Sequence, residues 1–147
     1  MIDGFQLTEE LISFEKGFDS WEEAIRASSA QLLKLGYIDQ FYVNQMISSL
    51  KEHGPYVIIA PNMAIPHARP EFGSKKVGFS VMICDEPVKF SCEQGQCARL
   101  FITLSTVTSQ MHLKVLQSLA IFMSKNDKIE KLINAKSKKE VLDIFNP

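Results

Sequence analysis

The sequence lacks the features that would place the protein in a membrane, outside the cell or on nucleic acid. No apolar run approaches the roughly 20 residues that a membrane-spanning helix needs. The first ten residues, MIDGFQLTEE, do not show the basic stretch followed by an apolar one that marks a secretion signal. The 16 Lys and Arg residues nearly balance the 17 Asp and Glu residues, so no basic field is available to attract nucleic acid. We therefore expect a cytoplasmic protein without membrane insertion and without a nucleic-acid partner.

Cysteine is scarce as well, and its spacing excludes two common uses. The three residues, Cys84, Cys92 and Cys97, are an odd number in a chain without an export signal, which argues against a disulfide framework. Seven and four residues separate them, and neither spacing matches a zinc ribbon or a Cys-x-x-Cys redox pair. We expect no metal site, and we expect Cys84 to pack as a small apolar group.

Several common catalytic and nucleotide-binding motifs are also missing. The sequence contains no Gly-x-x-x-x-Gly-Lys-Ser/Thr, no Gly-x-Gly-x-x-Gly and no Gly-x-Ser-x-Gly. Their absence removes the usual phosphate-binding loops and the nucleophile elbow of α/β-hydrolases. The carboxylates form no convincing acid/base pair either, so the chemistry has to be sought in other side chains.

What is present is the composition of a globular domain. The 147 residues are 46% hydrophobic and 22% charged, which suffices for one domain over residues 1–147 with a substantial core. Short apolar runs predict strands at about 11–18, 56–60, 63–66, 77–84 and 98–104. Apolar stripes at helical spacing predict helices at about 20–36, 39–52, 110–125, 127–134 and 137–145. Strands separated by helices favour an α/β fold with a mostly buried sheet.

Capping residues mark several of these helix ends. Ser20 with Glu23 forms a Ser-x-x-Glu capping box at the first helix, and Ser137 with Glu140 forms another at the last. Gly36 is a natural residue to end the first helix, because glycine accepts a left-handed conformation.

His67 stands on a rigid turn at the end of an expected strand. Pro66 comes just before it and Pro70 three residues after it, and each proline fixes φ and prevents a helix from continuing. A titratable side chain on a stiff loop beside a sheet is a candidate nucleophile or general base. The alternative is a structural histidine that merely caps the strand.

His112 is the second candidate, because Ser109 can cap the helix in whose first turn it would lie. Free backbone N–H groups and the positive end of the helix dipole attract anions there. The same field disfavours imidazolium and leaves a neutral side chain that can donate a hydrogen bond. The alternative is a histidine that fills space over the helix start. The third histidine, His53, is expected to be a solvated residue at a helix C-terminus.

Four segments in combination resemble a known family: IAPNMAIPHARPE, PVKF, RLFITLS and HLKVLQSLA. Together they resemble the enzyme IIA domains of the mannitol/fructose type, which belong to the bacterial phosphoenolpyruvate-dependent sugar phosphotransferase system. The continuation Pro-His-Ala-Arg-Pro-Glu and the preceding Gly-Pro-Tyr look closest to the ascorbate-specific and related branch. The resemblance runs from the helix at Ser20 to the last helix.

The resemblance implies a phosphoryl carrier, a phosphotransferase component that works through a phosphohistidine. His67 would accept a phosphoryl group from the histidine-containing phosphocarrier protein and pass it to the enzyme IIB component of a sugar permease. His112 matches the family's second histidine, which lies beside the first. The implied fold is a central mixed β-sheet of about five strands with helices on both faces. No cofactor or metal is implied, and we allow for a homodimer.

Among the groups that would bind the phosphoryl oxygens or assist them, this chain departs from the usual family residues at two positions. Arg69 and the backbone N–H groups of the helix start at Ser109 would serve them beside His112; the alternative for Arg69 is a solvated loop. Family members usually carry an arginine some sixteen residues before the acceptor, where this chain has Lys51. They also carry an acidic residue four positions before the second histidine, where it has Thr108. Lysine supplies charge but not the bidentate fork of arginine.

Two other functions stay open at this point. Phosphorylation of His67 could switch binding to a regulator instead of feeding a permease, as in some relatives of the family. His67 could instead act as a general base in a binding or hydrolytic protein, although no Ser or Cys nucleophile motif is present. Met63, Phe72 and Met111 would either form a contact patch for partner proteins or belong to the core.

Overall fold

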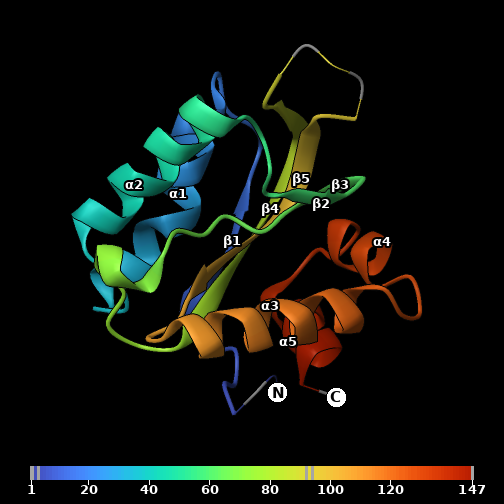
Figure 1. Ribbon diagram of the computed structural model, residues 1–147. Helices are drawn as coiled ribbons and strands as arrows, with labels where there is room; N and C mark the ends of the chain where they lie inside the picture. The colour runs from blue at the N-terminus through green and yellow to red at the C-terminus, as the bar shows by residue number, and fades with distance from the viewer. Residues whose placement is uncertain (1, 3, 92, 94, 147) are drawn as a thin grey trace.

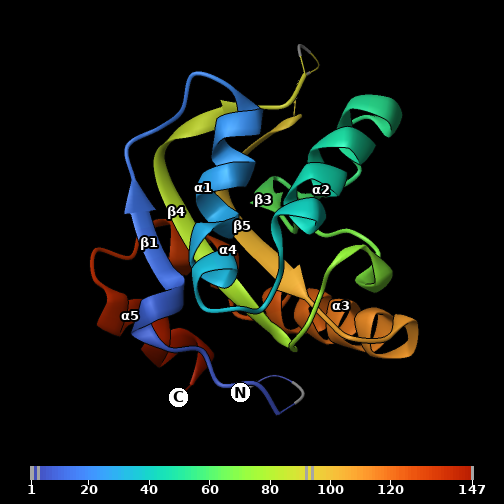
Figure 2. The ribbon, with the colours of Figure 1, turned by 90° about the vertical axis from the view of Figure 1, so that its left-hand side faces the viewer.

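The protein forms a five-stranded β-sheet between two groups of helices (Figure 1, Figure 2). The computed structural model describes residues 2, 4–91, 93 and 95–146, so the prediction for Cys92 lies outside the described residues. The strands are β1 (Ile12–Glu15), β2 (Ile58–Ala60), β3 (Asn62–Ala64), β4 (Gly78–Lys89) and β5 (Cys97–Ser105). The α-helices are α1 (Trp21–Lys34), α2 (Gln40–His53), α3 (Ser109–Met123), α4 (Lys128–Ile133) and α5 (Lys138–Phe145). Two single turns of 3-10 helix are η1 (Glu9–Leu11) and η2 (Pro70–Phe72).

The sheet is mixed, with the strand order β1-β4-β5-β3-β2. β1 runs parallel to β4 and β3 runs parallel to β5, whereas the β4–β5 and β2–β3 pairs are antiparallel. α1 and α2 cover one face of the sheet, and α3, α4 and α5 cover the other. This confirms the predicted α/β fold, a central mixed β-sheet of about five strands flanked by helices on both faces.

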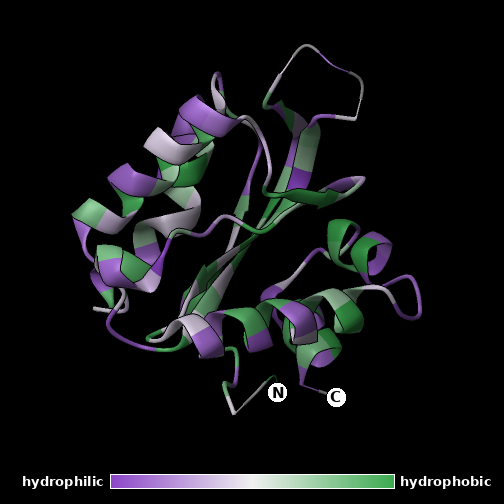
Figure 3. Ribbon diagram, viewed as in Figure 1, coloured by the Kyte–Doolittle hydropathy of each residue, from purple (hydrophilic) through white to green (hydrophobic). Residues whose placement is uncertain are grey.

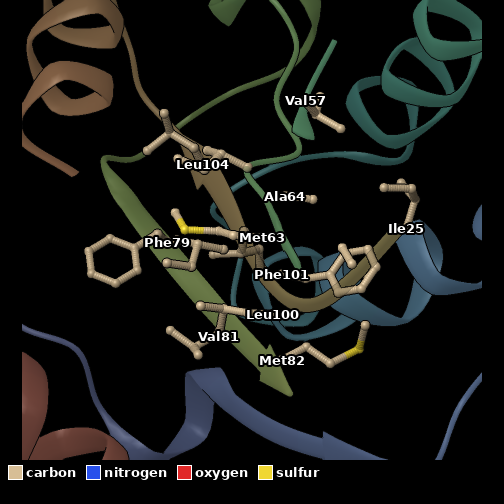
Figure 4. Packing of buried hydrophobic residues seen from close by; sticks show 14 of the residues in the cluster. Ile25, Val57, Met63, Ala64, Phe79, Val81, Met82, Leu100, Phe101 and Leu104 are labelled. Atoms are coloured by element: carbon tan, nitrogen blue, oxygen red, sulfur yellow. The ribbon is translucent and has the colours of Figure 1, made fainter. Parts of the chain in front are cut away.

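The core lies on both faces of the central strands β4 and β5. Alternate residues of β4 point to opposite helix layers, as a strand's period of two requires. Phe79 packs its ring 5.4 Å from that of Phe145 in α5, whereas the next residue, Ser80, donates a hydrogen bond to the Ser28 carbonyl of α1 over 2.6 Å. Figure 4 shows Phe79 and Met82 pointing in opposite directions within this core. Hydrophobic residues gather along the sheet and the helix faces turned toward it (Figure 3).

The predicted caps of the first and last helices are confirmed. The Ser20 hydroxyl accepts a hydrogen bond from the Glu23 amide over 3.2 Å, and the Ser137 hydroxyl accepts one from the Glu140 amide over 3.2 Å. Gly36 follows α1 with φ of 81°, a left-handed conformation that glycine adopts without a steric penalty. Each of these caps is a contact between near neighbours in the sequence, which explains why the sequence predicts them.

The prediction that Ser109 caps α3 is wrong. Thr108 is the N-cap: its backbone is extended, and its hydroxyl accepts a hydrogen bond from the Met111 amide over 3.1 Å. Ser109 is the first residue inside the helix. Both residues carry a hydroxyl group, but the His112 amide, three residues after Ser109, already donates to the Thr108 carbonyl oxygen inside the helix over 2.9 Å. The residue that departs from the family pattern therefore starts the helix that carries His112.

Replacing Thr108 by alanine should destabilise the protein by about 1 kcal/mol, because the Met111 amide loses its acceptor. Replacing Ser109 by alanine should change the free energy of unfolding by less than about 0.5 kcal/mol. Urea unfolding of the two variants and the wild type gives the comparison. A larger loss from Ser109→Ala than from Thr108→Ala would contradict the assignment of the cap.

Candidate functional site

The two candidate histidines meet at one edge of the sheet. β3 and β5 are parallel, with Met63 opposite Leu100, so the chain leaves both strands at the same edge. His67 follows β3, and His112 lies in the first turn of α3, which follows β5. Their rings are 4.9 Å apart between centroids and tilted by 54°. The structure thus brings together two residues that are 45 positions apart in the sequence.

The protonation of the His67 ring is set by its own loop. Its Nδ1 atom lies 2.7 Å from the carbonyl oxygen of Ile65, and a carbonyl oxygen can only accept, so Nδ1 carries the proton. The other nitrogen, Nε2, therefore keeps a free lone pair. Burial lowers the pKa of His67 from its ordinary value, partly opposed by the hydrogen bond to Ile65. A neutral ring with a defined nucleophilic nitrogen is the result.

His112 also has a hydrogen-bond partner at Nδ1, but one that can leave it in the opposite tautomer. Its Nδ1 atom lies 3.1 Å from the hydroxyl oxygen of Thr106, a fully buried residue. A threonine hydroxyl can donate or accept; in the tautomer in which it donates to Nδ1, the proton of the neutral ring is on Nε2, where it can be donated to a ligand. Burial lowers the pKa of His112, and the neighbouring His67 lowers it further. The neutral hydrogen-bond donor predicted at this helix start is thus compatible with the geometry.

A hollow of about 430 Å³ opens beside the two rings. Its lining comprises Tyr56, His67, Ala68, Arg69, Pro70, Glu71, Ser109 and His112. Arg69 and Ser109, which the sequence suggested as anion-binding residues, therefore line the same hollow as the two histidines. Glu71, an acidic residue that the sequence did not single out, lies in the same lining.

Lys51 is not among the residues that line this hollow. It is exposed in the last turn of α2. Its role as the counterpart of the arginine that family members usually carry stays a prediction. His53, two residues later, has its side chain 63% exposed at the end of α2, which confirms the prediction of a solvated residue.

Tyr56 is a site residue that the sequence did not identify. Its ring packs edge-on against His67, with the centroids 5.6 Å apart, and its hydroxyl lies 3.5 Å from the His67 carbonyl oxygen. Burial raises the pKa of Tyr56, so the hydroxyl remains a donor at neutral pH. The only signal for it was its place in the Gly-Pro-Tyr segment that supported the resemblance. Tyr56 was instead predicted to begin a strand, which starts at Ile58.

The structure shows how deeply the candidate patch residues Met63, Phe72 and Met111 and the cysteine Cys84 are buried. Met63 is fully buried and belongs to the core, so it is unavailable as part of a contact patch. Phe72 and Met111 are only partly buried and pack against that core. Cys84 is fully buried, which confirms that it packs as an apolar group, and burial raises the pKa of its thiol to about 12.

Acidification should destabilise the protein through the two site histidines. Their folded-state pKa values lie below the value of roughly 6.5 that histidine has in an unfolded chain. Below that pH the unfolded chain binds more protons than the folded one. The free energy of unfolding then falls as the pH drops from about 6.5 toward the folded-state pKa values, and this contribution is constant above that window.

Urea unfolding at about pH 7.5 and about pH 5.5 measures this effect. The double variant His67→Gln/His112→Gln serves as the control, because it keeps every carboxylate and loses only the two imidazoles. We expect the double variant to lose less stability on acidification than the wild type. Equal losses in the two proteins would contradict the assignment.

Comparison with known protein families places this geometry in context. A family model described as "Phosphoenolpyruvate-dependent sugar phosphotransferase system, EIIA 2" matches residues 5–147. The mannitol-specific cryptic phosphotransferase enzyme IIA component of Escherichia coli strain K12 is 34% identical over 138 residues, which cover 94% of this chain and 93% of that protein. A solution structure of that enzyme from Escherichia coli has a TM-score of 0.85 against this chain and covers the same shares of both.

Two further relatives extend the comparison. The ascorbate-specific enzyme IIA component of Shigella boydii serotype 4 is 26% identical over 129 residues, covering 87% of this chain and 84% of that protein. A complex of the mannitol enzyme IIA with phosphorylated mannitol enzyme IIB from Escherichia coli matches with a TM-score of 0.83 and 30% identity. That match covers 95% of this chain and 96% of the other. The mannitol and the ascorbate types are both represented among the relatives, as the sequence motifs indicated.

Proposed function

The chain belongs to the EIIA 2 family of the phosphoenolpyruvate-dependent sugar phosphotransferase system, and from that premise we propose that His67 is its phosphoryl acceptor. As an enzyme IIA component it is a phosphotransferase component. In the proposed cycle, His67 takes a phosphoryl group from the histidine-containing phosphocarrier protein. It then hands the group to an enzyme IIB component.

One observation carries the proposal. Nδ1 of His67 donates a hydrogen bond to the Ile65 carbonyl oxygen over 2.7 Å, which leaves Nε2 as a nucleophile beside His112 and the hollow. Burial lowers the pKa of His67, so the lone pair on Nε2 is free at neutral pH. A structural histidine that merely capped β3 would need neither this defined tautomer nor a second histidine at its side.

The transfer step needs positioning and charge stabilisation more than covalent help. Nε2 of His67 attacks the phosphorus atom of the donor phosphohistidine. The new N–P bond forms as the donor's N–P bond breaks, and the proton of His67 stays on Nδ1, which donates it to the Ile65 carbonyl oxygen. His112, Arg69 and the backbone amides of the first two residues of α3, Ser109 and Gln110, would hold the phosphoryl oxygens. Transfer to enzyme IIB repeats the step in the other direction.

The proposed partners are proteins that dock over the hollow. The mannitol enzyme IIA relative is known in a complex with phosphorylated enzyme IIB, which supports an enzyme IIB as the recipient. Exposed apolar side chains stand on the neighbouring elements: Tyr56 is 42% exposed and Leu113, one residue after His112, is 58% exposed. Such side chains suit transient contacts with two different carriers.

The place of action and the oligomeric state remain proposals. No helix in the described part of the chain has the length and apolar character needed to cross a membrane. We place the protein in the cytoplasm, where the family resemblance puts it, and retain the homodimer only as a prediction. The relatives are named for mannitol and for ascorbate, and we propose that the sugar is selected by the permease and not by this chain.

Incubation with phosphoenolpyruvate, enzyme I and the phosphocarrier protein tests the proposal. Intact mass should show one phosphate, labile in acid, and none when the phosphocarrier is left out. Enzyme IIB components of the mannitol and ascorbate types are then added separately. The one that matches this protein should take the phosphate from it. A folded wild-type protein that takes no phosphate, while a control enzyme IIA does, would refute the carrier role. Phosphorylation without transfer to any enzyme IIB would favour the regulatory alternative.

A further inference from the structure

A buried tyrosine in α2 holds the loop of His67 through its hydroxyl group. Tyr42 is fully buried, 26 positions before Ala68 in the sequence. Its hydroxyl accepts a hydrogen bond from the Ala68 amide over 3.1 Å and donates one to the Leu104 carbonyl oxygen over 2.8 Å. The Ala68 carbonyl oxygen lies 3.2 Å from the same hydroxyl. A single hydroxyl thus links the residue after His67 to the end of β5.

Both neighbours of His67 are tied to Leu104. The Leu104 amide donates to the Pro66 carbonyl oxygen over 3.0 Å, and the Leu104 carbonyl accepts from Tyr42, which in turn holds Ala68. Two residues further along the chain, Thr106 contacts Nδ1 of His112 over 3.1 Å. The end of β5 therefore sets the positions of both histidines.

The cap of α2 fixes Tyr42 itself and the far end of the same loop. The Tyr42 amide donates to the Asp39 carboxylate over 3.0 Å, and the Asp39 amide donates to the Gly73 carbonyl oxygen over 3.0 Å. A Cβ atom on Gly73, where φ is 119°, would collide with the Asp39 carboxylate. The segment from Ala68 to Gly73 is consequently tied to the start of α2 at both of its ends.

We propose that Tyr42 is a positioning residue for phosphoryl transfer, holding the His67 loop against β5 so that Nε2 faces the incoming phosphorus at the correct distance from His112. This inference rests on the proposed function. Burial raises the pKa of Tyr42 to about 12, so the hydroxyl keeps its proton and both hydrogen bonds at any working pH. Phosphoryl transfer depends on in-line geometry, and a misplacement of about 1 Å can cost about 100-fold in rate.

The variant Tyr42→Phe removes only the hydroxyl and leaves the docking surface untouched, since Tyr42 is buried. We expect kcat for phosphoryl acceptance from the phosphocarrier protein to fall by about 10- to 100-fold with KM nearly unchanged. The acidic limb of the rate profile should also move toward higher pH, because a looser loop exposes His67 and relieves the burial that lowers its pKa.

Ser80→Ala is the matched control. Ser80 is also buried, and its hydroxyl donates to the Ser28 carbonyl oxygen of α1, away from the histidine pair. Both variants are compared with the wild type at a temperature at which all three are folded. The control should keep the wild-type kcat and pH profile even if its thermal stability falls, whereas a purely structural role for Tyr42 would make the two variants behave alike.

The outcomes separate this inference from the proposed function. If the wild type accepts phosphate and Tyr42→Phe matches it in kcat and pH profile, the positioning role is refuted while the carrier role stands. If the wild type accepts no phosphate, both are refuted. Should Tyr42→Phe not fold, amide exchange of Ala68 in the wild type decides: exchange only on global unfolding supports the role, and fast exchange refutes it.

Discussion

Replacing His67 by alanine should abolish phosphoryl acceptance, with a rate loss of at least about 10³-fold. The reaction needs a neutral nitrogen with a free lone pair at the edge of the hollow, and Nε2 of His67 supplies it because Nδ1 is bonded to Ile65. His112 cannot take over in the same geometry, since the Thr106 hydroxyl donates to its Nδ1 and the proton of the neutral ring then occupies Nε2, which has no free lone pair. Intact mass after incubation with the phosphoenolpyruvate-driven carriers should show no acid-labile phosphate.

The control for this variant is His53→Ala. His53 is exposed at the end of α2 and does not line the hollow, so its removal should leave the phosphate and its rate of formation unchanged. An undiminished phosphate on His67→Ala, or its loss from His53→Ala, would contradict the assignment of the acceptor. Circular dichroism of both variants excludes unfolding as the cause of any loss.

Replacing His112 by alanine should slow the transfer by about 10²- to 10³-fold while leaving the phosphate on His67. The neutral His112 ring stands 4.9 Å from the His67 ring and can donate from Nε2 to the phosphoryl oxygens, whose charge is spread most widely in the transition state. Removing one such donor costs transition-state stabilisation without removing the nucleophile. Single-turnover measurements with phosphorylated carrier protein give the rate directly.

Two further substitutions test whether hydrogen-bond donation by His112 accounts for the rate loss of His112→Ala. His112→Gln keeps a side-chain N–H group, so it should recover part of the rate that His112→Ala loses. Thr106→Val, which cannot donate to Nδ1 of His112, should lie between the wild type and His112→Ala. If His112→Ala transfers at the wild-type rate, His112 only fills space over the start of α3, which was the alternative interpretation of the sequence.

The features that the sequence predicted are those decided by near neighbours. The capping boxes at Ser20 and Ser137 involve residues three positions apart, and both form as expected. The stiff turn at His67 follows from Pro66 and Pro70, whose φ angles are fixed wherever they occur. The error at Ser109 is of the same local kind, because two adjacent hydroxyl residues compete for one cap and a shift of one residue decides between them.

The features that the sequence did not reveal depend on the pairing of distant segments. In the sequence, Tyr42 cannot be told from the other residues on the buried face of α2. Its hydroxyl group finds its hydrogen-bond partners, Ala68 and Leu104, only when the chain is folded. Thr106 likewise gains its role from the first turn of α3. Lys51, which sequence spacing offered as a binding residue, is exposed in the last turn of α2 and does not line the hollow, so its role stays a prediction.

The nitrogen atom that carries the phosphate is the most direct test of the site chemistry. Long-range ¹H–¹⁵N correlation spectra of the ¹⁵N-labelled, phosphorylated protein distinguish the two ring nitrogens of each histidine. Because the Nδ1 proton of His67 is bonded to the Ile65 carbonyl oxygen, the phosphate is expected on Nε2 of His67, with Nδ1 still protonated. A phosphate on Nδ1 of His67, or on His112 or His53, would contradict the assignment of Nε2 as the acceptor.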